Sequence, residues 1–212
     1  MIRENNQNGL VQGYVLAGGG STRFGGDKAL AIFDGTPMLL RMQTLLRSVV
    51  KDMRVIAPAQ KYASVGITSV ADRWEGQGPL AGIITALLTT KESLSGIEWN
   101  LIIGCDMPFL TPDWLKYLQQ RASASEAEVI AARSPQGLEP LCACWRTSVA
   151  AKLRKTFDDG ARKVTEAMKR IDMEVIEEAD WKQFDAASRL FWNMNTIADY
   201  NEAKRILEAQ RA

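Results

Sequence analysis

A glycine-rich stretch with two cationic side chains lies near the start of the chain. The apolar run 15–17 leads into three consecutive glycines, and the stretch continues through Arg23 to Lys28. Glycine has no Cβ, so the backbone N–H groups of such a loop can approach an anion closely, and Arg23 and Lys28 add positive charge. This combination predicts a strand followed by a loop that binds the phosphates of a nucleoside triphosphate.

Two common phosphate-binding motifs do not fit this stretch. Gly20 and Gly25 have the spacing of a Walker motif, but the lysine and hydroxyl residue that must follow are absent. A dinucleotide fingerprint beginning at Gly18 and Gly20 would need a third glycine where Arg23 stands. The alternative to a phosphate loop is an ordinary glycine-rich turn between a strand and the next element.

An aspartate follows the most apolar strand of the chain. Residues 99–104, WNLIIG, are apolar on both faces in their middle, as in a strand covered on both sides. Asp106 comes directly after them, and Met107-Pro108 turns the chain. Its carboxylate would stand at the sheet edge, where it suits Mg²⁺ bound to a triphosphate. The alternative is a turn aspartate that binds its own backbone.

The chain contains no histidine. This excludes Ser-His-Asp catalysis, a histidine general base and histidine metal sites, and it leaves carboxylates, amides, lysine, arginine and the backbone. Magnesium bound by oxygen ligands fits what remains. The three cysteines, Cys105, Cys142 and Cys144, form no disulfide framework, and we expect Cys142 and Cys144 to be small core residues on one face of a strand.

Length and charge exclude other classes of function. The 212 residues suit one domain, which we place at 10–212 after a flexible N-terminus at 1–9. The net charge of +1 gives no global field for a nucleic acid or an anionic membrane. The apolar run 79–88 is about half of a bilayer crossing, and no leader opens the chain. We therefore expect a cytoplasmic protein that binds neither nucleic acid nor membrane.

Strand and helix patterns alternate along the chain. They predict an α/β fold with a mostly parallel, Rossmann-like twisted sheet and helices on both faces. Such sheets bind ligands at the carboxyl ends of their strands, where the glycine loop, Asp72 and Asp106 should meet. Residues 133–182 depart from the alternation and could cover the site, and Trp192 is expected at a strand position. We expect strands at 15–17, 54–57, 67–71, 99–104, 128–132, 141–145 and 173–177, and helices at 36–50, 76–90, 112–122, 148–155, 161–170 and from 198.

Four motifs together resemble the molybdenum cofactor guanylyltransferases. These enzymes belong to the nucleotidyltransferase superfamily with a glycosyltransferase-A-like fold, the nucleotide-diphospho-sugar transferase type. The resemblance covers about residues 13–207, and the L-A-G-G…R-x-G…D-K signature is specific to the wider superfamily. The motifs are LAGGGSTRFGGDK at 16–28, Asp72 followed by GPLAG at 78–82, GCDMP at 104–108 and NMNT at 193–196.

The resemblance implies transfer of GMP from GTP to the phosphate of molybdopterin or Mo-molybdopterin, with Mg²⁺ as cofactor and release of pyrophosphate. Proteins that deliver the pterin are possible partners. It assigns the backbone of Leu16, Ala17 and Gly18 to the guanine and Gly19 to the nucleotide. Arg23 and Lys28 are assigned to the phosphates and to catalysis, Asp72 to the nucleoside, and Asp106 to catalysis, nucleotide and metal. Asn195 is assigned to the metal, and Arg162 and Lys163, after Gly160, to the pterin.

Two departures from the family pattern leave substrate details open. The stretch 57–59, Ala-Pro-Ala, stands where an asparagine near the nucleotide is expected, so one base or ribose contact is missing or made by Gln60. The stretch 139–141, Glu-Pro-Leu, replaces a more polar motif on the acceptor side. Transfer of CMP to molybdopterin, transfer of a nucleotide to a sugar phosphate, and nucleotide binding without turnover are the alternatives.

Overall fold

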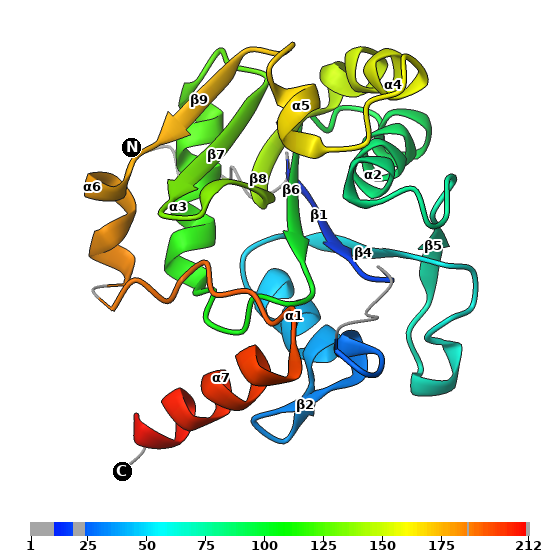
Figure 1. Cartoon of the computed structure of the whole chain (residues 1–212). Coiled ribbons are helices and arrows are strands. Elements are labelled where there is room, and N and C mark those ends of the chain that lie inside the picture. Colours follow the sequence, from blue (N-terminus) through cyan, green and yellow to red (C-terminus); the bar gives the residue numbers. More distant parts are fainter. Residues whose placement is uncertain (1–10, 19–23, 186, 211–212) are drawn as a thin grey trace, which may run out of the picture.

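A computed structural model describes residues 11–18, 24–185 and 187–210. Within these ranges the main sheet has seven strands in the order β5-β4-β1-β6-β8-β7-β9 (Figure 1). Strand β8 runs antiparallel to both of its neighbours, and the other pairings are parallel. The predicted mostly parallel sheet is therefore confirmed. Its strands are β1 (Val11–Leu16), β4 (Asp52–Ala57), β5 (Ser69–Ala71), β6 (Trp99–Gly104), β7 (Val129–Ser134), β8 (Gly137–Arg146) and β9 (Met173–Ile176).

Helices cover both faces of this sheet, as predicted (Figure 1). Helices α1 and α3 contribute to one apolar cluster, and helices α2, α4 and α5 contribute to a second cluster on the opposite face. The helices are α1 (Met38–Arg47), α2 (Pro79–Ser93), α3 (Pro112–Ala124), α4 (Ala150–Asp158), α5 (Val164–Met168), α6 (Glu178–Trp181) and α7 (Ile197–Ala209).

Strand β6 shows how one strand serves both clusters. Leu101 and Ile103 belong to the first cluster and Ile102 to the second, because successive side chains of a strand point to opposite faces. All six residues of β6 are buried. A strand buried on both faces has only its ends at the surface, so groups that bind a ligand from solvent can be placed only there.

A buried polar chain crosses the second cluster. Thr90 of α2 donates a hydrogen bond to Asn100 Oδ1 at 2.5 Å, so the hydroxyl of Tyr14 donates the 2.8 Å bond to Thr90 Oγ1. The Asn100 amide donates to the Trp145 carbonyl at 3.2 Å. Because each of these polar groups has a partner, this series of hydrogen bonds connects β1, α2, β6 and β8 without leaving one of them unpaired.

Three local expectations are changed by the structure. Residues 36–37 do not open α1 but form β3 (Thr36–Pro37), which pairs with β2 (Ile32–Phe33) across a turn at residues 34–35 with positive φ at both positions. The helix expected at 161–170 is the shorter α5. Trp192 is half-buried outside any strand, and its indole N–H has no partner among the described residues.

The cysteine prediction is confirmed. Cys105, Cys142 and Cys144 are free and buried, and Cys142 and Cys144 lie in the same apolar cluster. The indole N–H of Trp114 donates to Cys142 Sγ at 3.2 Å. Among the described residues, none of the helices combines the length and the apolar composition that spanning a bilayer requires.

The buried polar chain gives a test of the fold. We expect Thr90→Val to lower the free energy of unfolding by about 1–3 kcal/mol, because it leaves the Tyr14 hydroxyl and Asn100 Oδ1 without their partner. Thr44→Val on the exposed side of α1 is the matched control and should stay within about 0.5 kcal/mol of wild type. Urea denaturation measures both changes, and equal stability of the two variants would contradict the expectation.

Candidate active site

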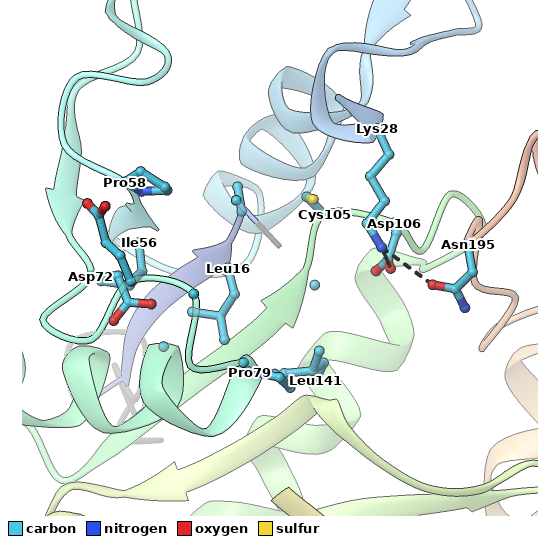
Figure 2. A pocket seen from close by; sticks show the side chains of 17 residues that line it. Leu16, Lys28, Ile56, Pro58, Asp72, Pro79, Cys105, Asp106, Leu141 and Asn195 are labelled. Atoms are coloured by element: carbon cyan, nitrogen blue, oxygen red, sulfur yellow. Dashed lines mark hydrogen bonds and ion pairs between the residues drawn. The ribbon is translucent and has the colours of Figure 1, made fainter. Parts of the chain in front are cut away.

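A cavity of about 470 Å³ lies where β1, β4 and β6 end and α2 begins (Figure 2). Leu16 pairs in register with Ile56 on one side and with Gly104 on the other, so the three strands end at the same level. The residues that follow each strand therefore meet in one place. The lining consists of Leu16, Ala17, Gly18, Lys28, Ile56, Pro58, Asp72, Glu75, Gly76, Gly78, Pro79, Gly82, Gly104, Cys105, Asp106, Leu141 and Asn195.

One end of the cavity contains a lysine between two oxygen-bearing side chains. The Lys28 ammonium donates a hydrogen bond to Asp106 Oδ2 and a longer one, at 3.4 Å, to Asn195 Oδ1 (Figure 2). Asp106 is only 8% exposed, so its negative charge needs a nearby partner such as this cation. The Met194 N–H donates to the Asp106 carbonyl at 2.9 Å, which ties the segment before α7 to this end of the cavity.

Lys28 is positioned by the residue before it. Asp27 caps the short 3₁₀ helix Lys28–Leu30 by accepting from the Ala29 N–H at 3.0 Å. The Tyr62 hydroxyl donates to the same carboxylate at 3.3 Å, and the Lys61 ammonium lies 2.9 Å from its second oxygen. Burial, followed by the charge of Asp27, raises the pKa of Tyr62, so this hydroxyl stays protonated as a donor.

Gly104 makes room for the Asp106 carboxylate. A Cβ at Gly104 would lie 2.8 Å from Asp106 Oδ1 and 3.6 Å from the Leu141 Cβ. A side chain at this position would therefore displace the Asp106 carboxylate. Cys105, which separates these two residues, has its pKa raised to about 12 by burial and by the neighbouring Asp106 charge. It is therefore a neutral thiol rather than a nucleophile at neutral pH.

The other end of the cavity is formed by Asp72, Pro58 and the end of β1 (Figure 2). Asp72 Oδ1 accepts from the Thr85 hydroxyl of α2 at 2.9 Å and from the Trp74 N–H at 3.1 Å. Gly18 has φ +115°, and a Cβ there would lie 2.4 Å from Pro58 Cδ. The strand ends of β1 and β4 can approach this closely because of that glycine.

A buried carboxyl lies in β8 outside the cavity lining. Glu139 is 6% exposed and accepts a hydrogen bond from the Ser134 hydroxyl at 2.6 Å. Burial raises the pKa of Glu139, and the charge of Asp106 raises it further. Of the 139–141 stretch, Leu141 lines the cavity wall and the Glu139 carboxyl does not.

The structure brings most of the sequence-derived site residues together. Leu16, Ala17, Gly18, Lys28, Asp72, Asp106 and Asn195 line the same cavity, although they come from segments up to 179 residues apart (195 − 16). Gly19 and Arg23 lie outside the described residues. Of the residues that sequence reasoning did not assign, Ile56 is signalled by its place at a strand end and Pro79 by the GPLAG motif.

The two residues assigned to the pterin are not part of this cavity wall. The Arg162 guanidinium donates to the Phe157 and Ala161 carbonyls at 2.8 and 2.9 Å and to Gln77 Oε1 at 3.1 Å. These bonds hold it against α4. Lys163 is exposed and immediately precedes α5. Their assignment to an acceptor stays a prediction.

Comparisons with known proteins identify the family of this chain. The sequence profile of the MobA-like NTP transferase domain matches residues 13–172. The chain is 28% identical over 203 residues to the molybdenum cofactor guanylyltransferase of Desulfosudis oleivorans, covering 95% of this chain and 98% of that protein. It is 30% identical over 204 residues to the molybdenum cofactor guanylyltransferase of Nitrobacter hamburgensis, covering 92% and 94%.

A solved structure shows the same fold. The molybdopterin-guanine dinucleotide biosynthesis protein A of Archaeoglobus fulgidus superimposes with a TM-score of 0.80 at 22% identity, over 93% of this chain and 99% of that one. The expected nucleotide-diphospho-sugar transferase type of fold is thus confirmed. The family profile and the named relatives define a nucleotidyltransferase. Within that class, the chain belongs to the family with the MobA-like NTP transferase domain.

The close approach at Gly104 gives a test of the site. We expect Gly104→Ala to weaken nucleotide binding in the presence of Mg²⁺ at least about tenfold, because a Cβ 2.8 Å from Asp106 Oδ1 must displace that carboxylate. Ser93→Ala at the exposed end of α2 is the control, since this residue lies outside the cavity lining. Calorimetric titration measures both affinities, and unchanged binding by Gly104→Ala would show that the carboxylate position is not needed.

Proposed function

We propose that this chain transfers GMP from GTP to the terminal phosphate of molybdopterin or its molybdenum-loaded form, releasing pyrophosphate and forming molybdopterin guanine dinucleotide. The observation that carries the proposal is the single cavity with Lys28, Asp106 and Asn195 at one end and Asp72 at the other. A nucleoside triphosphate has the same polarity, since charged phosphates lie at one end and a neutral base at the other. We infer the acceptor from the names of the relatives, which are molybdenum cofactor guanylyltransferases.

The oxygen donors at the cationic end fit a magnesium ion. Mg²⁺ takes one or two protein oxygens together with phosphate oxygens and water, and Asp106 and Asn195 offer a carboxylate and an amide oxygen side by side. The Lys28 ammonium already lies between these oxygens, which indicates that the position favours positive charge. When bound, the ion would neutralise charge on the α-phosphate and the leaving pyrophosphate.

The reaction needs no general base from the protein. The acceptor is a phosphate monoester whose second pKa is about 6, so its oxygen is mostly ionised at neutral pH. That oxygen forms a bond to the α-phosphorus of GTP while the bond from this phosphorus to the bridging oxygen breaks, and pyrophosphate leaves with the electron pair. Lys28 and Arg23 would hold the phosphates in line, and Asp72 would orient the nucleoside. A chain without histidine can perform these steps.

The other functions considered are less well supported. A binding module without turnover would not need a carboxylate that is 8% exposed beside the phosphate end, because burying that charge costs free energy. Transfer of CMP, or transfer to a sugar phosphate, would use the same phosphate geometry. These reactions differ from GMP transfer to molybdopterin only in the base or in the acceptor. Protein partners that deliver the pterin, and an intracellular location in the cytoplasm, belong to this proposal as well.

The function is tested by the choice of nucleotide. With purified chain, Mg²⁺ and molybdopterin, we expect pyrophosphate release and dinucleotide formation with GTP, and at least about tenfold less with CTP or ATP. Asp106→Ala should abolish product while the protein stays folded by circular dichroism. Asp113→Ala, which removes an exposed carboxylate from α3, should leave turnover unchanged. Preference for CTP, or turnover by Asp106→Ala, would show that the assignment is wrong.

Lys28 gives a second measurement at the phosphate end. We expect Lys28→Ala to lower kcat/KM for GTP at least about tenfold, or about 1.4 kcal/mol, because a charge contact to the phosphates is lost. Lys116→Ala on the exposed side of α3 is the control: it removes one positive charge, as Lys28→Ala does, and should leave kcat/KM unchanged. Steady-state kinetics at fixed Mg²⁺ measures both variants. An unchanged kcat/KM for Lys28→Ala would show that this lysine does not contribute a charge contact to the phosphates.

A further inference from the structure

A carboxylate outside the four motifs lines the cavity. Glu75 lies in the connection between β5 and α2, and its Oε1 accepts a hydrogen bond from the Ala59 N–H at 3.1 Å. Pro58, the residue before Ala59, lies with Asp72 at the end of the cavity away from Lys28 and Asp106 (Figure 2). The bond to Ala59 therefore fixes the Glu75 carboxylate at the end opposite the phosphates, where the base of a nucleotide would lie.

The cations Lys61 and Arg73, which belong to these two segments, are paired with other carboxylates. Lys61 lies 2.9 Å from Asp27 Oδ2. The Arg73 guanidinium makes a two-pronged contact with Glu92, one bond of which is 2.9 Å. Glu75 is itself exposed, so it presents a negative acceptor surface that neither cation neutralises. Such a surface favours a ligand that offers hydrogen-bond donors.

Asp72 is less able than Glu75 to accept a pair of donors. Asp72 Oδ1 already accepts from the Thr85 hydroxyl and the Trp74 N–H, which uses both of its lone pairs. Glu75 Oε1 accepts a single bond, and its second oxygen accepts none from the described residues. Glu75 thus keeps acceptor capacity on both oxygens, as two parallel donor bonds require.

We propose that Glu75 binds the N1–H and N2–H₂ donors of guanine and so determines the choice of GTP, an inference that rests on the proposed function. Guanine presents these two donors side by side, whereas adenine and cytosine each present a ring-nitrogen acceptor beside a single amino group. Glu75 takes the role left open by the missing asparagine at 57–59. Gln60, the residue considered for that contact from sequence, does not line the cavity.

The test compares GTP with ITP, which keeps N1–H and lacks the 2-amino group. Dissociation constants are measured by calorimetry with Mg²⁺ for wild type, Glu75→Gln, Glu75→Asp, Asp72→Asn and the exposed control Glu126→Gln. We expect wild type and Glu126→Gln to bind GTP at least about tenfold more tightly than ITP. Glu75→Gln should weaken GTP binding at least about tenfold and bring the two nucleotides within about threefold. Glu75→Asp, which keeps the charge but withdraws it, should show an intermediate ratio.

Three outcomes would overturn the inference. The GTP preference could persist in Glu75→Gln, it could be lost in Asp72→Asn instead, or Glu75→Gln could weaken GTP and ITP equally, as a ribose contact would. Each of these leaves wild-type GTP binding intact and so leaves the proposed function standing. Preference of the wild-type protein for CTP over GTP would instead contradict the proposed function itself.

Discussion

Burial of β1 and β6 on both faces is the constraint on which the rest of this structure depends. Their apolar side chains are divided between two apolar clusters, so groups that bind a ligand are confined to the residues at and after the end of each strand. Parallel pairing aligns Leu16 with Ile56 and with Gly104. The consequence is a level sheet edge at which residues distant in sequence surround one cavity without any loop having to cross the core.

Glycines allow close approaches at three positions in the cavity wall. Gly18 allows β1 to approach Pro58, Gly104 leaves room for the Asp106 carboxylate, and a Cβ at Gly82 of α2 would lie 3.3 Å from Leu16 Cδ1. Protein interiors are close-packed, so an added methyl group at these positions has to be accommodated by its neighbours. The shape of the site is therefore set by glycines as much as by the residues that carry charge.

Charge is distributed unequally along the cavity. Lys28 compensates the buried Asp106 at one end, and the carboxylates of Asp72 and Glu75 stand at the other. Anionic phosphates are favoured near the lysine and disfavoured near the two carboxylates, so this distribution orients a nucleotide before any specific base contact forms. Positioning and charge neutralisation are the main protein contributions to phosphoryl transfer, which suits a chain that lacks histidine.

The sequence by itself determined the alternation of strands and helices and placed Lys28 and Asp106 in one site, because these follow from local periodicity and from residues at strand ends. It did not determine the antiparallel direction of β8, since a buried strand has the same pattern in either direction. Only the tertiary structure decided that Glu75 enters the cavity through its bond to Ala59 and that the Arg162 guanidinium is held by backbone carbonyls. Such contacts join residues whose local patterns carry no information about each other.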